Sequence, residues 1–145
     1  MVRLRDGRLE LTGPCAADAW YIESHEEDDP MEIVKRLSTN LLGPPLLVHS
    51  TSWRRAPAGV FLTFLVVIGE DQAADLESVP ITRADLARNS ATEPAKKIAA
   101  NQVVEHALRH MAWLAQDDDA VRNVLSPAWL AALAGYVPEP FRHLS

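Results

Sequence analysis

The chain has 145 residues, of which 48% are hydrophobic and 23% are charged, and its formal net charge is -6 at pH 7. These are ordinary values for a globular protein with a single core, so we expect one domain over residues 1–145. The negative charge disfavours nucleic acid and anionic membranes as partners, because both polyanions recruit patches of Lys and Arg.

Cysteine content and apolar runs indicate the compartment. Cys15 is the single cysteine, so it cannot form an intramolecular disulfide. The longest apolar run, Val60 to Ile68, is far shorter than the roughly 20 residues of a membrane helix, and no signal-peptide pattern opens the sequence. We therefore expect a soluble, acidic protein of the reducing cytoplasm, with no membrane partner.

The first predicted elements are a hairpin and a short strand. Weak alternation from Arg3 to Leu11 around Asp6-Gly7 is typical of a small hairpin. Residues Asp18 to Ser24 contain a Trp-Tyr-Ile triplet that favours a strand. An acidic stretch, Glu23 to Asp29, follows and is expected to be solvated at the start of a helix.

That helix, Asp29 to Leu42, has the clearest end signals in the chain. Asp29 is a predicted N-cap, Pro30 takes the first helical position, Glu32 would close a capping box, and Gly43 ends the helix. Apolar residues at helical spacing predict one face packed on a sheet and the other in solvent. The apolar positions are Ile33, Val34, Leu37 and Leu41, and the solvent positions are Lys35, Arg36 and Asn40.

Two strands are predicted next, Leu46 to Trp53 and Val60 to Ile68, joined by a turn at Arg54 to Gly59. They are expected to pair as a hairpin. Because the second strand is apolar on both faces, we expect it to be central in the sheet and covered by helices on two sides.

The C-terminal part, about 82–136, is predicted to be helical after a loop from Gly69 to Pro80, which makes the fold class α+β. A helical turn at Thr82 to Arg88 precedes the longest helix, Pro94 to Gln116, which is also the expected surface of a possible homodimer. Ser126-Pro127 begins a last helix. Other expected features are a core stripe of Val104, Leu108, Met111 and Ala115, an interruption at Asp117 to Asp119, a helix end at Gly135, and a tail, Val137 to Ser145, docked by Phe141.

The order of strand, acidic segment, helix and hairpin resembles the Nudix hydrolases, whose signature is G-x5-E-x7-R-E-U-x-E-E-x-G-U with U apolar. Gly43 matches the second glycine, Arg36 the arginine and Asp28 the first glutamate. In the hairpin, Ser50 and Trp53 are similar to the S-Q-P-W-P-F-P segment of NADH pyrophosphatases. The resemblance covers about Asp18 to Ile68, and it implies a Nudix-like sandwich with a mixed or antiparallel sheet.

The same resemblance implies that the family's chemistry is missing. In that family, helix glutamates hold the Mg²⁺ that bridges a diphosphate. Leu37, Asn40 and Leu41 stand at the three corresponding positions, and Ile22 replaces the first glycine. We therefore expect a non-catalytic binding or interaction module with no cofactor. The alternative is a Mg²⁺-dependent hydrolase of nucleoside-diphosphate-linked substrates with relocated ligands, drawn from Glu26, Glu27, Asp28 and Glu32.

Histidines offer a second, separate metal hypothesis. His106 and His110 are four residues apart on the long predicted helix, and His49 or Glu105 could complete a zinc set. The alternative is an ordinary polar helix flank, because no third ligand is fixed by spacing. A Ser-His hydrolase is disfavoured, since His49 shares a strand face with Thr51 rather than with a flanking serine.

For an unidentified small ligand or protein partner, the candidate binding residues are Trp53, Arg54, Arg55 and His49. An arginine pair beside an indole could hold a phosphate or stack on a base. The alternative is that both arginines are solvated turn residues.

Overall fold

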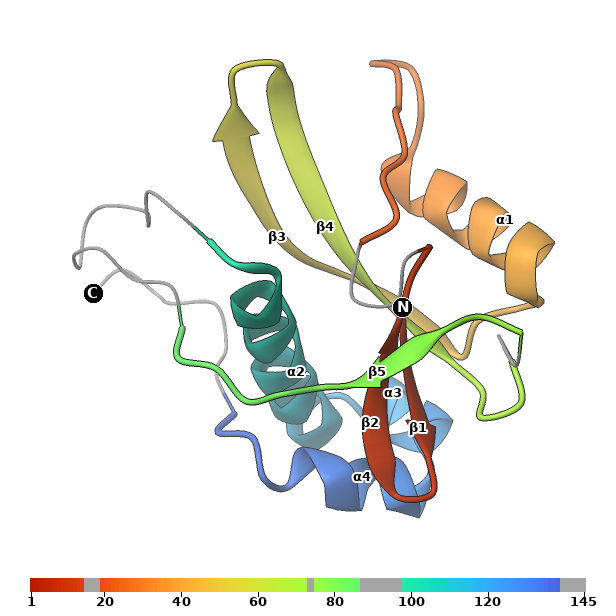
Figure 1. The fold of residues 1–145 in the computed structure, drawn as a ribbon, viewed down its shortest axis with the longest axis vertical. Coiled ribbons are helices and arrows are strands. Elements are labelled where there is room, and N and C mark those ends of the chain that lie inside the picture. Colours follow the sequence, from red (N-terminus) through yellow and green to blue (C-terminus); the bar gives the residue numbers. More distant parts are fainter. Residues whose placement is uncertain (15–18, 73–74, 87–97, 139–145) are drawn as a thin grey trace. The chain divides into compact units, whose positions relative to one another are not determined.

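The computed structural model describes residues 1–14, 19–72, 75–86 and 98–138. Those residues form a mixed sheet and helices that lie mostly in the C-terminal part, so the α+β fold class is confirmed (Figure 1). The chain divides into two compact units, Met1–Val79 and Pro80–Ser145. Within the described residues, no helix combines the length and the apolar character that crossing a membrane requires.

The sheet has five strands in the order β3-β4-β1-β2-β5. β1 pairs antiparallel with β2 and parallel with β4, and β4 pairs antiparallel with β3. Asp6 and Gly7 have positive φ angles in the β1–β2 turn, which confirms the predicted hairpin there. The strands are β1 (Val2–Arg5), β2 (Arg8–Thr12), β3 (Leu47–Ala56), β4 (Gly59–Ile68) and β5 (Ser78–Pro80).

Helix α1 (Pro30–Leu42) begins and ends where the sequence predicts. The Asp29 carboxylate accepts hydrogen bonds from two first-turn backbone N–H groups, and Gly43 leaves the helix at a φ of 87°. Glu32 differs from the expected capping box, because its carboxylate accepts a hydrogen bond from Lys35 at 3.1 Å. The predicted packing face is also shifted: Leu41 is exposed and Ser38 is buried, its hydroxyl donating to a backbone carbonyl one turn earlier.

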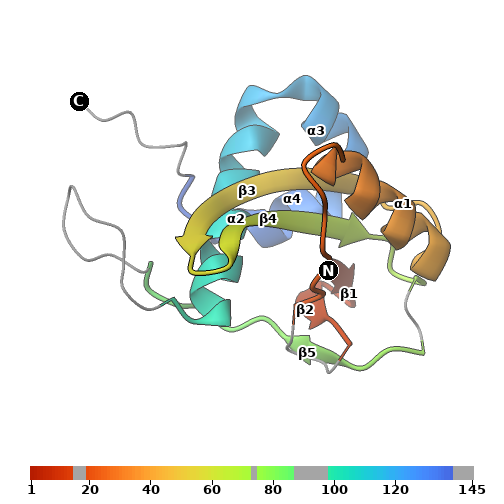
Figure 2. The same ribbon diagram turned by 90° about the horizontal axis from the view of Figure 1, so that it is seen from above.

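The core of this unit forms where α1 meets the hairpin of β3 and β4. Val66 and Ile68 of β4 are buried at its centre, and partly buried apolar side chains from α1, β3 and two other segments pack around them. Figure 2 shows that the β3–β4 hairpin continues well beyond α1 toward its turn. The surrounding side chains are Met1, Val34, Leu42, Val48 and Leu76.

The predicted strand at Asp18 to Ser24 is wrong for the residues that can be described. Residues 19–24 are irregular, and Tyr21 and Ile22 are exposed. Aromatic and β-branched residues favour a strand only when a neighbouring strand offers a surface to pack on. No strand pairing is present at residues 19–24, and Asp18 lies outside the described residues.

A buried arginine ties the loop after β4 to the β1–β2 hairpin. Arg3 donates to Glu10 at 3.0 Å, to the Ser78 hydroxyl at 2.9 Å and to the Gln72 carbonyl at 3.0 Å. Burial raises the pKa of the Glu10 carboxyl, but hydrogen bonds from Ser78 and Arg3 outweigh it, so the pKa lies below its ordinary value. The predicted loop from Gly69 to Pro80 therefore ends in a short strand, β5.

The second unit contains α2 (Ala100–Asp117), α3 (Asp119–Val124) and α4 (Pro127–Leu133). The long helix is confirmed but begins later than expected, and residues 94–97 lie outside the described residues. Asp118 caps α3 and Ser126 caps α4, which ends two residues before Gly135. Of the predicted core stripe, Leu108, Met111 and Ala115 are buried and Val104 is half-buried.

A buried carboxylate on α2 explains why the predicted helical turn after Thr82 does not form within residues 82–86. Arg83 donates to both oxygens of Glu105, at 3.0 and 2.9 Å, and to the Gly135 carbonyl at 2.8 Å. Its guanidinium also lies 4.1 Å from the centre of the Tyr136 ring. Residues 82–86 carry no regular secondary structure, and Arg88 and the tail residue Phe141 lie outside the described residues.

Candidate functional site

The candidate ligand residues lie on the part of the hairpin beyond α1, residues 53–62, which we call the outer hairpin. Trp53 pairs with Leu62, Arg54 with Phe61 and Arg55 with Val60 across the two strands. The strands extend further than predicted, so the connecting turn is shorter than Arg54 to Gly59.

Alternation along β4 divides the hairpin into two faces. Val66 and Ile68 pack with side chains of α1, so this face, which also carries Val60 and Leu62, is the α1 face. Cross-strand partners share a face, which places Trp53 and Arg55 on the α1 face as well. The apolar surface that α1 covers near the core therefore continues along the strand without that cover.

The part of this face that α1 does not cover carries large apolar side chains that are exposed to solvent. Trp53 is 70% exposed, Val60 59% and Leu62 46%. This contradicts the expectation that helices cover the second strand of the hairpin on both sides along its length, which fails at the outer hairpin. Adjacent exposed large apolar side chains of this kind are typical of interaction sites.

The two arginines do not form a phosphate clamp. Arg54 and Arg55 are consecutive in a strand, so their side chains leave opposite faces. The Arg54 guanidinium lies 5.1 Å from the centre of the Phe61 ring on the face opposite α1. Arg55 alone accompanies Trp53, which makes joint chelation of one phosphate geometrically unfavourable.

His49 lies on the part of β3 nearer the core. It pairs with Leu65, which is buried, and a bulge at Ser50 to Ser52 separates it from Trp53. Burial lowers the pKa of His49 below its ordinary value. The structure therefore does not join His49 to the other three candidates in one site.

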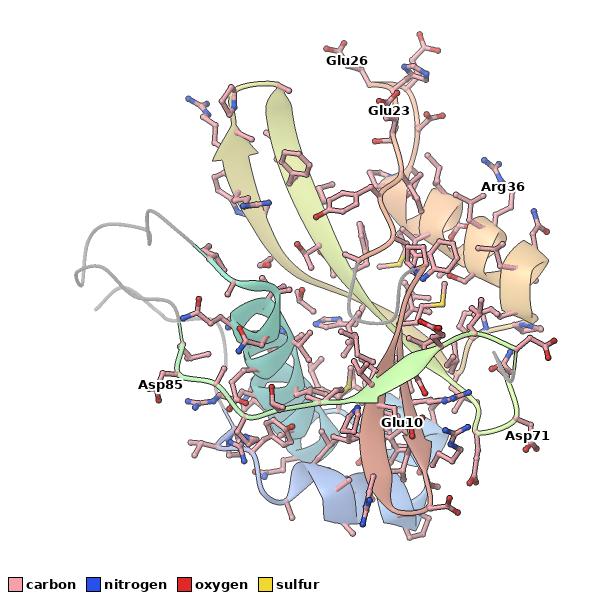
Figure 3. All side chains as sticks on the ribbon, in the orientation of Figure 1. Glu10, Glu23, Glu26, Arg36, Asp71 and Asp85 are labelled. Carbon is pink, nitrogen blue, oxygen red and sulfur yellow. The ribbon has the colours of Figure 1, made fainter. Side chains whose placement is uncertain are left out.

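The acidic segment, residues 23–29, stands at the same end of this unit as the outer hairpin (Figure 1). Glu26, Glu27 and Asp28 are exposed there, and Figure 3 shows Glu26 at the tip. Asp28 accepts a hydrogen bond from the His25 backbone at 2.9 Å, and Glu32 lies apart on α1 paired with Lys35. Among the described residues, no group of three or more His, Cys, Asp or Glu side chains is placed to hold a metal ion.

The two histidines of the zinc hypothesis, His106 and His110, lie on α2 in the second unit. His106 and His110 stack with ring centres 6.5 Å apart, and His110 also stacks on Trp113 at 5.7 Å. Glu105, the suggested third ligand, accepts hydrogen bonds from Arg83 and from Arg109. Burial raises the pKa of Glu105, but hydrogen bonds from these arginines outweigh it and the pKa lies below its ordinary value.

A pocket of about 480 Å³, which sequence reasoning missed, opens at the C-terminal end of α1. Trp20, Asp71 and Asp75 contribute to its lining. Trp20 is distant in the sequence from Asp71 and Asp75, and no motif links them, so no local pattern predicts that they line one pocket.

The described residues form an α+β protein with an exposed apolar and basic hairpin surface and a separate pocket. Comparisons of the chain with protein-family models, with curated proteins and with solved structures found no match.

Proposed function

We propose that the N-terminal unit is a non-catalytic interaction module on a divergent Nudix-like scaffold, that it acts through the outer hairpin, and that its partner is a second copy of the chain. The observation that carries this proposal is the shared face of Trp53, Val60 and Leu62, which stays exposed beyond α1. An apolar strip of this kind is stabilised when a partner removes it from water.

The scaffold part of the proposal is supported by α1 and the hairpin that follows it. α1 contacts β3, in the order that the resemblance implies. At the positions of the family's metal-binding glutamates, Leu37 is half-buried while Asn40 and Leu41 are exposed. None of these three side chains carries a carboxylate, so the diphosphate chemistry has no ligand set on this helix.

Charge complementarity favours a second copy over another occupant. The outer hairpin presents Arg55 on the same face as the apolar strip, and the acidic segment, residues 23–29, lies at the same end of the unit. In a twofold dimer each patch meets its complement on the other chain, which makes the surface self-complementary. Local pairing of this kind offsets the repulsion between two chains that each carry a net charge of -6.

This replaces the expectation of a dimer through the long helix. The apolar stripe of α2 is already buried within the chain, so it offers no comparable strip to a partner. A single cysteine, which cannot form an intramolecular disulfide, supports the reducing cytoplasm as the proposed compartment.

Sedimentation equilibrium over a range of concentrations tests the proposal. We expect the molar mass to rise from 16.0 kDa toward twice that value. Trp53→Ala should raise the dimer dissociation constant by about tenfold or more, because buried tryptophans dominate interface energies. Arg55→Glu should weaken the dimer as well, because it places like charges together.

The matched control is Arg8→Glu, which makes the same charge change at an exposed position outside the outer hairpin. It should leave the dissociation constant of the dimer unchanged. A mass of 16.0 kDa at every concentration would overturn the proposal, and so would a dimer that is insensitive to Trp53→Ala.

A further inference from the structure

The pocket at the end of α1 combines apolar, aromatic and acidic side chains. Its lining residues include the apolar Leu41, Leu42 and Leu76, the aromatic Trp20, and the acidic Asp71 and Asp75. All of these residues belong to the N-terminal unit. Ligand pockets typically pair such an apolar lining with a few polar groups that select the ligand.

Gln72 fixes the wall of this pocket before any ligand arrives. Its side-chain oxygen accepts from the Gly69 backbone at 2.7 Å, and its nitrogen donates to the carbonyls of Leu42 at 2.9 Å and Pro44 at 3.0 Å. The residue that follows Asp71 is thereby fastened to the end of α1. A wall held in this way lowers the ordering cost of binding.

Three sources of negative potential meet at the pocket. Asp71 and Asp75 are the first two, and the C-terminal end of the α1 dipole is the third. The last turn of α1 carries no basic residue to offset this dipole end. Arg3 also touches this loop, through the Gln72 carbonyl, but it forms an ion pair with Glu10 at 3.0 Å.

Trp20 adds an aromatic surface that suits a cation. Trp20 lines the pocket, and its ring nitrogen is buried and has no hydrogen-bond partner among the described residues. The face of an indole attracts ammonium and guanidinium groups through its quadrupole.

We propose that this pocket binds an organic cation, a primary ammonium or guanidinium group carried on a short apolar chain. The carboxylates and the helix end select the charge, and the leucines with Trp20 accept the chain. This site is distinct from the outer hairpin and does not depend on self-association.

The probe is pentylammonium chloride, titrated into isotope-labelled protein while the indole N–H signals of the tryptophans are recorded by NMR. We expect a saturable shift of the Trp20 signal with a dissociation constant of about 1 mM, which is what a ligand of six heavy atoms can supply. The Trp53 signal should stay in place, which separates this test from that of the outer hairpin.

The charge requirement is tested with a double variant and a matched control at fixed ionic strength. Asp71→Asn with Asp75→Asn should raise the dissociation constant about tenfold, and Glu70→Gln with Glu77→Gln, the same charge change outside the lining, should leave it unchanged. Pentanol and pentanoate should not displace pentylammonium from the pocket. Equal binding of pentanol, an equal loss in both double variants, or no saturable shift at Trp20 would overturn the proposal.

Discussion

The two halves of β4 have similar sequences and opposite environments. Leu65 to Ile68 are all buried, whereas Val60 to Leu62 are all exposed, although each stretch is purely apolar. The difference lies in the neighbours: Val67 and Ile68 also pair with β1, and α1 packs over the inner half of the hairpin. An apolar run therefore shows that a surface needs cover, and its neighbours decide whether the chain itself provides that cover.

A bulge marks the border between the two halves. Ser50 pairs with Phe64 and Ser52 with Thr63, so Thr51 is the extra residue on β3. Its side chain is fully buried, and its hydroxyl donates to the Thr63 carbonyl at 3.2 Å. Bulges increase the local twist of a strand pair and bend it. The outer hairpin can thus leave the direction of the sheet without losing its pairing.

The largest expected difference between the halves is in stability. Ile68→Ala should lower the free energy of unfolding by about 3 kcal/mol, because it opens a cavity at a fully buried position. Leu62→Ala on the outer hairpin should cost less than about 0.5 kcal/mol. Urea denaturation of dilute samples measures both. Similar losses at the two positions would show that the outer hairpin belongs to the core.

The border itself gives a smaller effect. Thr51→Val should cost about 1 kcal/mol, because it keeps the shape of the side chain but removes a buried hydrogen bond. Thr39→Val is the matched control, since the Thr39 hydroxyl donates to the Lys35 carbonyl at an exposed position. Urea midpoints at constant slope give the comparison. If both variants lose the same free energy of unfolding, the buried hydrogen bond at the bulge contributes no more to stability than the exposed one.

A still smaller effect should appear in the pH dependence of the free energy of unfolding, through His49 on the inner half of the hairpin. Burial lowers the pKa of His49 in the folded chain, so the unfolded chain, which titrates near 6.5, binds more protons as the pH falls through that value. The stability contribution of neutral His49 is therefore full above about pH 7.5 and decreases below it until the folded pKa is reached. His49→Gln should flatten this part of the stability profile between pH 7.5 and 5. An unchanged profile would contradict the assignment.

The smallest expected effect is that of divalent metal on the acidic segment. Mg²⁺ or Mn²⁺ should leave the melting temperature unchanged and release no product from dinucleotide substrates, because the described carboxylates are not gathered into a ligand set. A metal-dependent rise in melting temperature that disappears in Glu27→Gln or Asp28→Asn would instead support the hydrolase alternative.

Local signals in the sequence predicted local structure well. The cap at Asp29, the proline after it and the glycine at position 43 act within a few residues, and α1 begins and ends where they indicate. The hairpins were predictable for the same reason. The features that the sequence did not predict depend on contacts between residues that are far apart in the chain. Arg83 and Glu105 are 22 residues apart, and the Arg3 and Ser78 side chains meet across 75.

The candidate site was predictable only in its residue types. Trp53, Arg54 and Arg55 were identified as ligand candidates, but the opposite directions of the two arginines follow from a strand that extends past the predicted turn. The exposure of Val60 depends on how far α1 packs along the hairpin. Hydrophobic periodicity in the sequence does not predict that distance. The resemblance to the Nudix hydrolases stays a prediction.

The most direct test is a dilution series of amide spectra from isotope-labelled protein. If the outer hairpin is the contact between two copies, the amide signals of residues 53–55 and 60–62 shift with concentration, while those of residues 65–68 stay in place. Two results would contradict the proposed interaction surface. One is that only the signals of residues 65–68 shift with concentration, and the other is that the spectrum does not change at all.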